Sequence, residues 1–334
     1  TLPEATQRMH RALREFRIRG VNTNTSFLLN LLREPKFVAG LATVKFINEN
    51  QQLLAPPIWK DRATKMLRYI ADVIVNSNPD VKEINPNAIF LPIAVPASGN
   101  SGSLPEGTRD IKQRLGRDGF IAWIKNEKPI LYTDTTFRDG HQSLLATRMR
   151  TFDMIKVADT YAQSAAPFLF SMEVWGGATF DVAMRFLKEC PWDRLAQLRE
   201  RIPNVLFQML LRGSNAVGYT AYPDNLVERF IVNAAETGID IFRIFDSLNW
   251  LEAMKTSIRT VRNETDAIAE ASICYSGDLT DPSKTKFNLQ YYLDLARALE
   301  DEGAHIIAIK DMAGLLKPLA AETLVTHLKK SVDI

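Results

Sequence analysis

The sequence predicts an α/β protein: a (β/α)8 TIM barrel truncated after about six β/α units, preceded by a small α+β region. Three observations predict this fold. From Pro129 onward, short apolar runs alternate with amphipathic segments of helical length. Each run and its following segment together take roughly 30–40 residues, as expected for parallel strands joined by crossover helices. No glycine-rich nucleotide fingerprint accompanies these units, which favours a barrel over a doubly wound sheet.

The elements of the barrel follow from hydrophobic periodicity. The predicted strands are 130–135, 168–175, 205–211, 239–245, 268–275 and 305–309. The predicted helices are 152–165, 181–200, 222–237, 249–262, 287–303 and 318–331. We expect a seventh strand to begin at Val332-Asp333-Ile334, which would leave the barrel two strands short.

The region before the barrel is less regular. We expect helices over 4–16, 27–32 with Ser26 as its cap, 61–75 running into a strand, and 110–124. The alternation in Arg17–Asn24 predicts a short strand and turn. Residues 76–109 are rich in Pro, Asn, Ser and Gly, which is typical of a linker or an irregular connecting region.

Composition excludes several classes of protein. The 334 residues are 46% hydrophobic and 24% charged, which is ordinary for a globular protein. A net charge of +2 gives no reason to expect a nucleic acid or an anionic membrane as partner. No apolar run reaches the length of a membrane span, and the first residues do not resemble a signal peptide. Cys190 and Cys274 are far apart and fit no metal spacing, which favours a reducing compartment.

Catalytic groups of such barrels gather at the C-terminal ends of the strands, so polar residues at those ends are the candidates for a site. The first strand is followed by the polar run Asp134–Ser143. Within it, a carboxylate could ligate a divalent metal, and Arg138 or Gln142 could hold an anionic or carbonyl substrate. The alternative is a polar loop whose aspartate caps the next helix.

Three further strand ends carry candidates. Gly176 and Gly177 after the second strand would let backbone approach a ligand closely, while Asp181 could serve the site or simply cap a helix. Arg212 after the third strand suits a carboxylate, with a rim salt bridge as the alternative. Arg243 lies within the fourth strand, where we expect it to pair with acids in the barrel interior.

Lys310 closes the apolar sixth strand. A charged, unpaired lysine is costly in a buried place, so its pKa should fall. A neutral amine could become a carbamate that bridges to a metal. The alternatives are a Schiff-base lysine or a lysine paired with Asp311. These residues alone leave the three alternatives open.

Histidines are scarce, with four in the chain. His10 lies outside the barrel, His327 is on a helix, and His305 starts a strand at the end opposite to catalysis. Only His141 lies beside the suspected site. No two histidines have metal-ligand spacing, so the histidine ligands of a transition metal would have to lie beyond Ile334.

Several motifs, in order along the chain, resemble the carboxyltransferase domain of biotin-dependent carboxylases. They are Asp134–Arg148, Trp175–Asp181, Gln208–Arg212, Phe242–Asn249 and Lys310–Gly314. Glu15–Asn24 resembles the tail of a biotin-carboxylase domain. Both features on one chain resemble the pyruvate carboxylase family rather than the separate subunits of transcarboxylase or oxaloacetate decarboxylase. The resemblance implies three parts: the end of a biotin-carboxylase domain (1–50), an allosteric and tetramerisation linker (51–125), and an incomplete carboxyltransferase barrel (126–334).

The resemblance implies transfer of carbon dioxide from carboxybiotin to pyruvate, giving oxaloacetate, at the expense of ATP, Mg and bicarbonate at a distant site. Biotin would arrive on a carrier domain that this chain does not contain. The implied roles are substrate binding for Arg212, Gln142 and Arg138, orientation of biotin or pyruvate for Tyr219 and Asp181, and ligation of Zn or Mn by Asp139 and a carbamylated Lys310.

Regulation and assembly are implied in the same way. Arg17, Arg19 and Arg62 resemble arginines that contact the phosphates of the activator acetyl-CoA, with a basic solvated surface as the alternative. A homotetramer is implied, in a bacterial cytoplasm or a mitochondrial matrix. Because the ATP-binding part, the biotinyl-lysine, two metal-binding histidines and a proton-relaying threonine are absent, we expect the chain alone to be inactive. The alternatives are a regulatory and assembly module, or a related oxaloacetate decarboxylase or transcarboxylase subunit.

Overall fold

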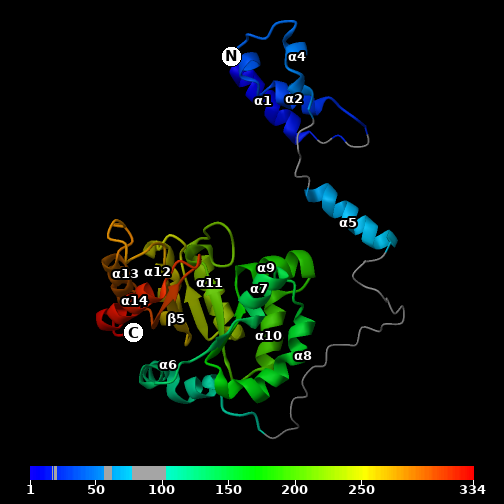
Figure 1. Cartoon of the computed structure of the whole chain (residues 1–334). Coiled ribbons are helices and arrows are strands. Elements are labelled where there is room, and N and C mark those ends of the chain that lie inside the picture. The colour runs from blue at the N-terminus through cyan, green and yellow to red at the C-terminus, as the bar shows by residue number, and fades with distance from the viewer. Residues whose placement is uncertain (17, 19–20, 56–61, 77–102) are drawn as a thin grey trace. The chain divides into compact units, whose positions relative to one another are not determined.

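The computed structural model describes residues 1–16, 18, 21–55, 62–76 and 103–334 (Figure 1). The chain divides into two compact units, Thr1–Pro92 and Ile93–Ile334. None of the described helices is both long and apolar enough to cross a membrane.

The regular elements described in the first unit are all helices. Its elements are α1 (Leu2–Glu15), α2 (Thr25–Leu31), α3 (Pro35–Val38), α4 (Phe46–Glu49), the 3-10 turn η1 (Gln51–Leu54) and α5 (Arg62–Asn76). Leu29, Phe46 and Leu53 form its small buried core. Asn30 Nδ2 donates to the carbonyl oxygens of Leu53 and Ala55 at 3.0 and 2.9 Å, which ties α2 to the segment that follows η1.

Three expectations for this unit need correction. Helix α2 begins at Thr25 with Asn24 in the cap position, so Ser26 is not the cap. Residues 18 and 21–24 form no strand, and Arg17, Arg19 and Gly20 lie outside the described residues. Helix α5 stays helical to Asn76 instead of running into a strand, because its apolar side chains recur at helical spacing. Most of the predicted linker 76–109 also lies outside the described residues.

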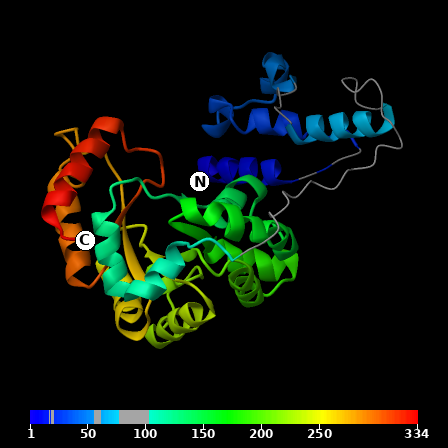
Figure 2. The ribbon, with the colours of Figure 1, turned by 90° about the horizontal axis from the view of Figure 1, so that it is seen from below.

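The second unit is built on six parallel strands in the order β1 to β6. They are β1 (Thr133–Asp134), β2 (Ser171–Trp175), β3 (Leu206–Leu211), β4 (Ile241–Ile244), β5 (Ile268–Cys274) and β6 (Ile306–Lys310). The sheet curls and carries its helices outside, so the expected class, a truncated (β/α) barrel, is confirmed (Figures 1 and 2). Residues 332–334 form no strand, and Val332 and Ile334 pack against the apolar core instead.

The helices of this unit follow the predicted order. They are α6 (Thr108–Asn126), α7 (His141–Leu145), α8 (Thr151–Thr160), α9 (Gly177–Val182), α10 (Pro191–Arg201), α11 (Asp224–Thr237), α12 (Leu251–Glu264), α13 (Leu289–Asp301) and α14 (Pro318–Ser331). The predicted helix 181–200 is two helices, because Lys188 adopts a left-handed φ of 59° and Pro191 starts a new helix. Short π turns η2 (Thr136–Gly140), η3 (Tyr161–Ala165) and η5 (Ala183–Leu187), and 3-10 turns η4 (Ala166–Phe168) and η6 (Gly213–Asn215), complete the connections.

Strand β1 is much shorter than the predicted 130–135. Ile130 and Tyr132 are 78% and 63% exposed, so no burial holds them in the sheet. Pairing begins only where Thr133 meets Ser171 of β2. The predicted start of the strand was therefore wrong, because hydrophobic periodicity does not show which residues have a neighbouring strand.

The two faces of the curled sheet differ in chemistry, because alternate residues of a strand point to opposite sides. The outer face is apolar and meets the helices in one large core, with fully buried residues such as Met172, Phe207 and Phe242. The inner face starts at its N-terminal end with an apolar layer of Leu206, Ile241 and Ile268. Two residues further along the same strands come the polar side chains Gln208, Arg243 and Glu270.

Helix α6 closes the N-terminal end of the half-barrel (Figure 2). Phe120, which is fully buried, packs on the apolar layer of Leu206, Ile241 and Ile268. The start of the helix is tied to the strands: Thr108 Oγ1 donates to the Phe170 carbonyl at 2.7 Å, and the Arg109 N–H donates to the Asn204 carbonyl at 3.0 Å. Water is thereby kept from the inner face at this end.

We therefore expect Phe120→Ala to lower the free energy of unfolding by about 3–5 kcal/mol, through lost burial and the cavity it leaves. Denaturant unfolding of the complete protein, followed by circular dichroism, measures this. The matched control is Leu115→Ala on the same helix, where the side chain is 42% exposed and little change is expected. Equal effects of the two variants would show that α6 does not depend on Phe120.

Candidate functional site

Arg138 is the centre of the first loop at the C-terminal end of the strands. It lies in η2, the π turn that follows β1, and only 8% of its side chain is exposed. Its Nη2 donates to Glu173 Oε1 at 2.8 Å, and its Nη1 donates to Asp139 Oδ1 at 3.0 Å and Gln142 Oε1 at 3.4 Å. One guanidinium thus connects two predicted site residues, Asp139 and Gln142, with a buried acid on β2.

Glu173 was not among the candidates from sequence. It is completely buried in the middle of β2, on the inner face. The available signal in the sequence was a single carboxylate within a strand whose residues are all buried. Such a carboxylate requires a cation nearby. Its partner Arg138 is 35 positions away in the chain and could not be named from spacing.

A second ion pair lies beside the first on the inner face. Arg243 Nε donates to Glu270 Oε1 at 2.6 Å, which confirms that the strand arginine pairs with an acid inside the barrel. Gln208 Nε2 donates to the other oxygen of the same carboxylate. Burial raises the pKa of Glu270, and the charge of Arg243 opposes that rise.

Lys310 ends β6, paired in register with Cys274 of β5. It is half-buried, and its Nζ lies 5.1 Å from the centroid of the Phe245 ring. Burial, assisted by the positive charge of Arg138, lowers the pKa of Lys310, which confirms the predicted direction. Asp311 is engaged elsewhere, since its two carboxylate oxygens each accept a backbone N–H, from Leu315 and Leu316, at 2.9 Å.

Arg212 follows β3 and is enclosed by small or aromatic neighbours. Its Nη1 donates to the Gly218 carbonyl at 3.0 Å, and its Cζ lies 5.3 Å from the Tyr219 ring centroid. A Cβ added to Gly177 would lie 2.9 Å from that Cζ, so a larger residue there would displace the Arg212 guanidinium. Arg212 forms no ion pair with any residue that the structure describes, so no rim salt bridge to a described residue occupies it.

The two neighbouring glycines, Gly176 and Gly177, leave room for two arginine side chains. A Cβ on Gly176 would lie 3.2 Å from Arg138 Cδ, just as one on Gly177 would meet Arg212. The close approach inferred from the sequence therefore exists, but in the structure the groups that approach are the two guanidinium side chains.

Asp181 and Tyr219 come together from different loops. Tyr219 is 70% exposed, and its hydroxyl donates to Asp181 Oδ2 at 3.1 Å. Arg185 donates to Asp181 Oδ1 at 3.0 Å, and these two contacts, Arg185 first, lower the pKa of Asp181. The alternative of an N-cap is wrong, because Asp181 lies inside α9 and Gly176 holds the cap position.

His141 does not reach the mouth of the half-barrel. It is 2% exposed, and its Nε2 lies 2.8 Å from the Phe137 carbonyl oxygen, which points to a packing role. Burial lowers its pKa. Asp134 accepts the Thr136 N–H at 2.6 Å and the Tyr161 hydroxyl at 3.1 Å, so it organises the turn after β1.

Two residues of this chain are predicted metal ligands, Asp139 and Lys310. The Asp139 side chain is 53% exposed. In residues 1–16, 18, 21–55, 62–76 and 103–334 no three His, Cys, Asp or Glu side chains lie together so that they could hold a metal ion. These donors do not complete a metal site by themselves. Of the predicted activator residues, Arg17 and Arg19 lie outside the described residues, and Arg62 begins α5.

Fold and site together combine six parallel strands, paired charges on the inner face, and Arg138, Gln142, Arg212 and Lys310 at or just after the C-terminal ends of the strands. A solved carboxyltransferase domain from Rhizobium etli pyruvate carboxylase, with pyruvate and biocytin, is similar in structure. Its TM-score is 0.70 at 52% identity, covering 82% of this chain and 45% of that one. The Rhizobium etli pyruvate carboxylase with the allosteric activator acetyl coenzyme A covers 99% of this chain and 33% of that one, with a TM-score of 0.71 at 51% identity.

The chain matches a central segment of pyruvate carboxylases over its whole length. It is 52% identical over 334 residues to the enzyme of Bacillus subtilis and 51% identical over 331 residues to the mitochondrial enzyme of Homo sapiens. It spans 29% and 28% of the lengths of these relatives. The family model of the biotin carboxylase C-terminal domain matches residues 1–49. Bacterial and mitochondrial enzymes are thus both among its relatives.

His305 lies where it was predicted, at the N-terminal end of the strands and away from the site. It is 7% exposed, and its Nδ1 accepts the Ala269 N–H at 2.9 Å, so this nitrogen must be unprotonated. Burial, then the charges of Arg117 and Arg262, lower its pKa from 6.5 to about 4.

The folded state therefore binds a proton at His305 less readily than the unfolded state does. The stability this contributes is complete above pH 6.5 and is lost as the pH falls toward 4. We expect a loss of up to ~3 kcal/mol over this window, and a flatter pH dependence in His305→Leu. Denaturant unfolding at several pH values measures both. His327→Leu, at an exposed position of α14, is the control; an unchanged slope in His305→Leu would contradict the account.

Proposed function

We propose that this chain is the carboxyltransferase segment of a biotin-dependent pyruvate carboxylase. The complete enzyme would transfer carbon dioxide from carboxybiotin to pyruvate and form oxaloacetate, using ATP, Mg and bicarbonate to make carboxybiotin elsewhere. The single observation that carries the proposal is Arg212, a cation packed on Gly177 and Tyr219 at the C-terminal end of the strands, with no described acid paired to it. Such a group suits a small carboxylate.

Pyruvate would bind between residues of two strand ends, those of β1 and β3. Arg212 uses one N–H for the Gly218 carbonyl and keeps the others for the substrate carboxylate. Gln142 and Arg138 would hold the carbonyl side of pyruvate. When a proton leaves the methyl carbon for the biotin that has released its carbon dioxide, negative charge develops on that carbonyl oxygen, and positive groups fixed in advance would stabilise it. The resulting enolate carbon would then attack carbon dioxide released from carboxybiotin.

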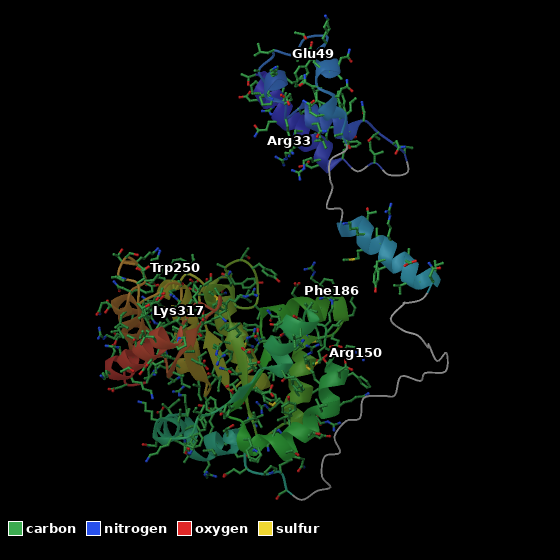
Figure 3. All side chains as sticks on the ribbon, viewed as in Figure 1. Arg33, Glu49, Arg150, Phe186, Trp250 and Lys317 are labelled. Atoms are coloured by element: carbon green, nitrogen blue, oxygen red, sulfur yellow. The ribbon has the colours of Figure 1, made fainter. Side chains whose placement is uncertain are left out.

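The biotin carrier is the proposed protein partner. Tyr219 and Asp181, already joined by a hydrogen bond, would orient the biotin ring at the mouth. Large apolar side chains are exposed on the segments that follow the strands: Leu144, Phe186, Leu248, Trp250 and Met312. Phe186 and Trp250 lie along the edge of the half-barrel opposite α6 (Figure 3). An exposed apolar rim of this kind fits a site at which a protein domain docks.

A divalent metal, Zn or Mn, would polarise the substrate oxygen as a Lewis acid. Asp139 would be one ligand and Lys310, as a carbamate, another, with the remaining ligands outside the described residues. The lowered pKa of Lys310 favours the uncharged amine that carbamate formation requires.

The first unit suggests a second function that is compatible with the first, regulation and assembly. Its support is the match of residues 1–49 to the biotin carboxylase C-terminal domain and the acetyl coenzyme A in the similar Rhizobium etli structure. We propose 1–50 as the end of a biotin-carboxylase domain, 51–125 as the allosteric and tetramerisation linker and 126–334 as the carboxyltransferase barrel. Arg17, Arg19 and Arg62 would contact acetyl-CoA phosphates in a homotetramer, in either a bacterial cytoplasm or a mitochondrial matrix.

The pyruvate site is tested by Arg212→Ala in the complete enzyme. We expect kcat/KM for pyruvate to fall by about 100-fold or more, through loss of a charge-assisted bidentate contact, while bicarbonate-dependent ATP cleavage continues. Steady-state assays of both half-reactions measure this. The control is Arg259→Ala, an exposed arginine on α12 that pairs with Glu302. Full pyruvate carboxylation by Arg212→Ala would show that the assignment is wrong.

The regulatory role is tested by Arg62→Ala. We expect the acetyl-CoA concentration for half-maximal activation to rise by about 3–10-fold, because one phosphate contact is lost. Activity titrations with acetyl-CoA provide the measurement, with Lys65→Ala, an exposed cation of the same helix, as control. Identical curves for Arg62→Ala and Lys65→Ala would remove Arg62 from the activator site.

A further inference from the structure

Glu173 is buried too deeply to touch a substrate. Its residue exposure is 0%, and it lies on the inner face of β2. Its contact with Arg138 is close at both oxygens, 2.8 Å from Nη2 to Oε1 and 2.7 Å to Oε2. Among the described residues, the hydrogen bond and ion pair of its carboxylate go to Arg138, so Glu173 can set the position of groups at the mouth only through Arg138.

The two Nη atoms of Arg138 have different partners. Nη2 faces Glu173, whereas Nη1 donates to Asp139 and Gln142. Because a guanidinium is planar and rigid, fixing Nη2 also sets the position of Nη1. Gly176 leaves room for this path of the side chain, since a Cβ there would lie only 3.2 Å from Arg138 Cδ.

We propose that Glu173 is a positioning residue, which aims the Arg138 guanidinium so that its Nη1 edge holds Gln142 and Asp139 in place at the mouth. The inference rests on the proposed function for the identity of the ligand, a 2-oxo acid, but not for the geometry. Without the Glu173 carboxylate, Asp139 is the remaining acid within reach of Arg138, and the guanidinium should turn toward it and release Gln142.

Glu270 offers a matched comparison. It is also a buried inner-face glutamate paired with an arginine, but its partners are Arg243 and Gln208, which are not contacts of Arg138. Glu173→Gln and Glu270→Gln should therefore both lower the thermal midpoint. If Glu173 has a positioning role, only Glu173→Gln should also change ligand binding at the mouth.

The experiment uses the complete enzyme and oxamate, an unreactive analogue of pyruvate, with Kd measured by calorimetry. We expect Glu173→Gln to weaken oxamate binding by about tenfold, and Glu270→Gln to change it by less than about twofold. In an Arg138→Gln background, Glu173→Gln should have no further effect, because the residue through which it acts is gone. A loss of oxamate affinity that is the same with and without Arg138, or no loss at all, would overturn the proposal.

A crystal structure of the Glu173→Gln enzyme decides the question independently of oxamate and of whether the Arg138→Gln variant folds. Arg138 should have left Gln142; unchanged contacts from Nη1 to Asp139 and Gln142 would overturn the proposal. The proposed function has a separate arm. If the unsubstituted enzyme binds no oxamate, or binds it equally well as Arg212→Ala, the pyruvate assignment fails, while the geometry of Arg138 still tests the positioning role.

Discussion

The inner face of the half-barrel is organised by the requirement that a buried charge must have a partner. Glu173 and Glu270 both lie on that face, 0% and 4% exposed, and each would be strongly destabilising without its arginine. Arg138, from the turn η2, pairs with Glu173, and Arg243, from β4, pairs with Glu270. The two ion pairs specify how β1, β2, β4 and β5 are aligned, because a shift by one residue would put a charge into the apolar outer core.

This requirement divides the interior into levels along the strands. At the N-terminal end, Phe120 and the apolar layer exclude water. The paired charges come next, and the C-terminal end holds Arg212 and Lys310, which no described carboxylate neutralises. Arg212 is thereby open to an anionic ligand, and Lys310, whose pKa is lowered by burial, is open to reaction as an amine. The architecture thus separates groups that keep the barrel folded from groups that are free to act.

The strands, the helices and the residues at strand ends could be predicted from the sequence wherever the pattern is local. Five of the six strands and the helices between them follow from periodicity, because each buries one side against the same core. The place of Arg212 and Lys310 at strand ends follows from chain position alone. Arg243 was predicted to pair inside the barrel, since a strand arginine has no other way to be buried.

What could not be predicted depends on contacts between distant residues. The partnership of Glu173 with Arg138, the plug formed by Phe120 and the contact of Gly177 with Arg212 join positions that have no common local pattern. The failure at Asp181 has the same origin: a cap was expected from residue type, but the preceding glycines begin α9 earlier. Metal ligation also stays a prediction, because it requires groups from several separate segments.

The central claim is that the C-terminal end of this half-barrel binds a 2-oxo acid through Arg212. The most direct measurement is a high-resolution structure of the complete enzyme with oxamate, bicarbonate and divalent metal. Our account predicts the oxamate carboxylate on the Arg212 guanidinium, with Gln142 beside it and a carboxylated Lys310 sharing a metal with Asp139. Oxamate bound elsewhere, with Arg212 paired to a protein carboxylate and Lys310 bare, would contradict it.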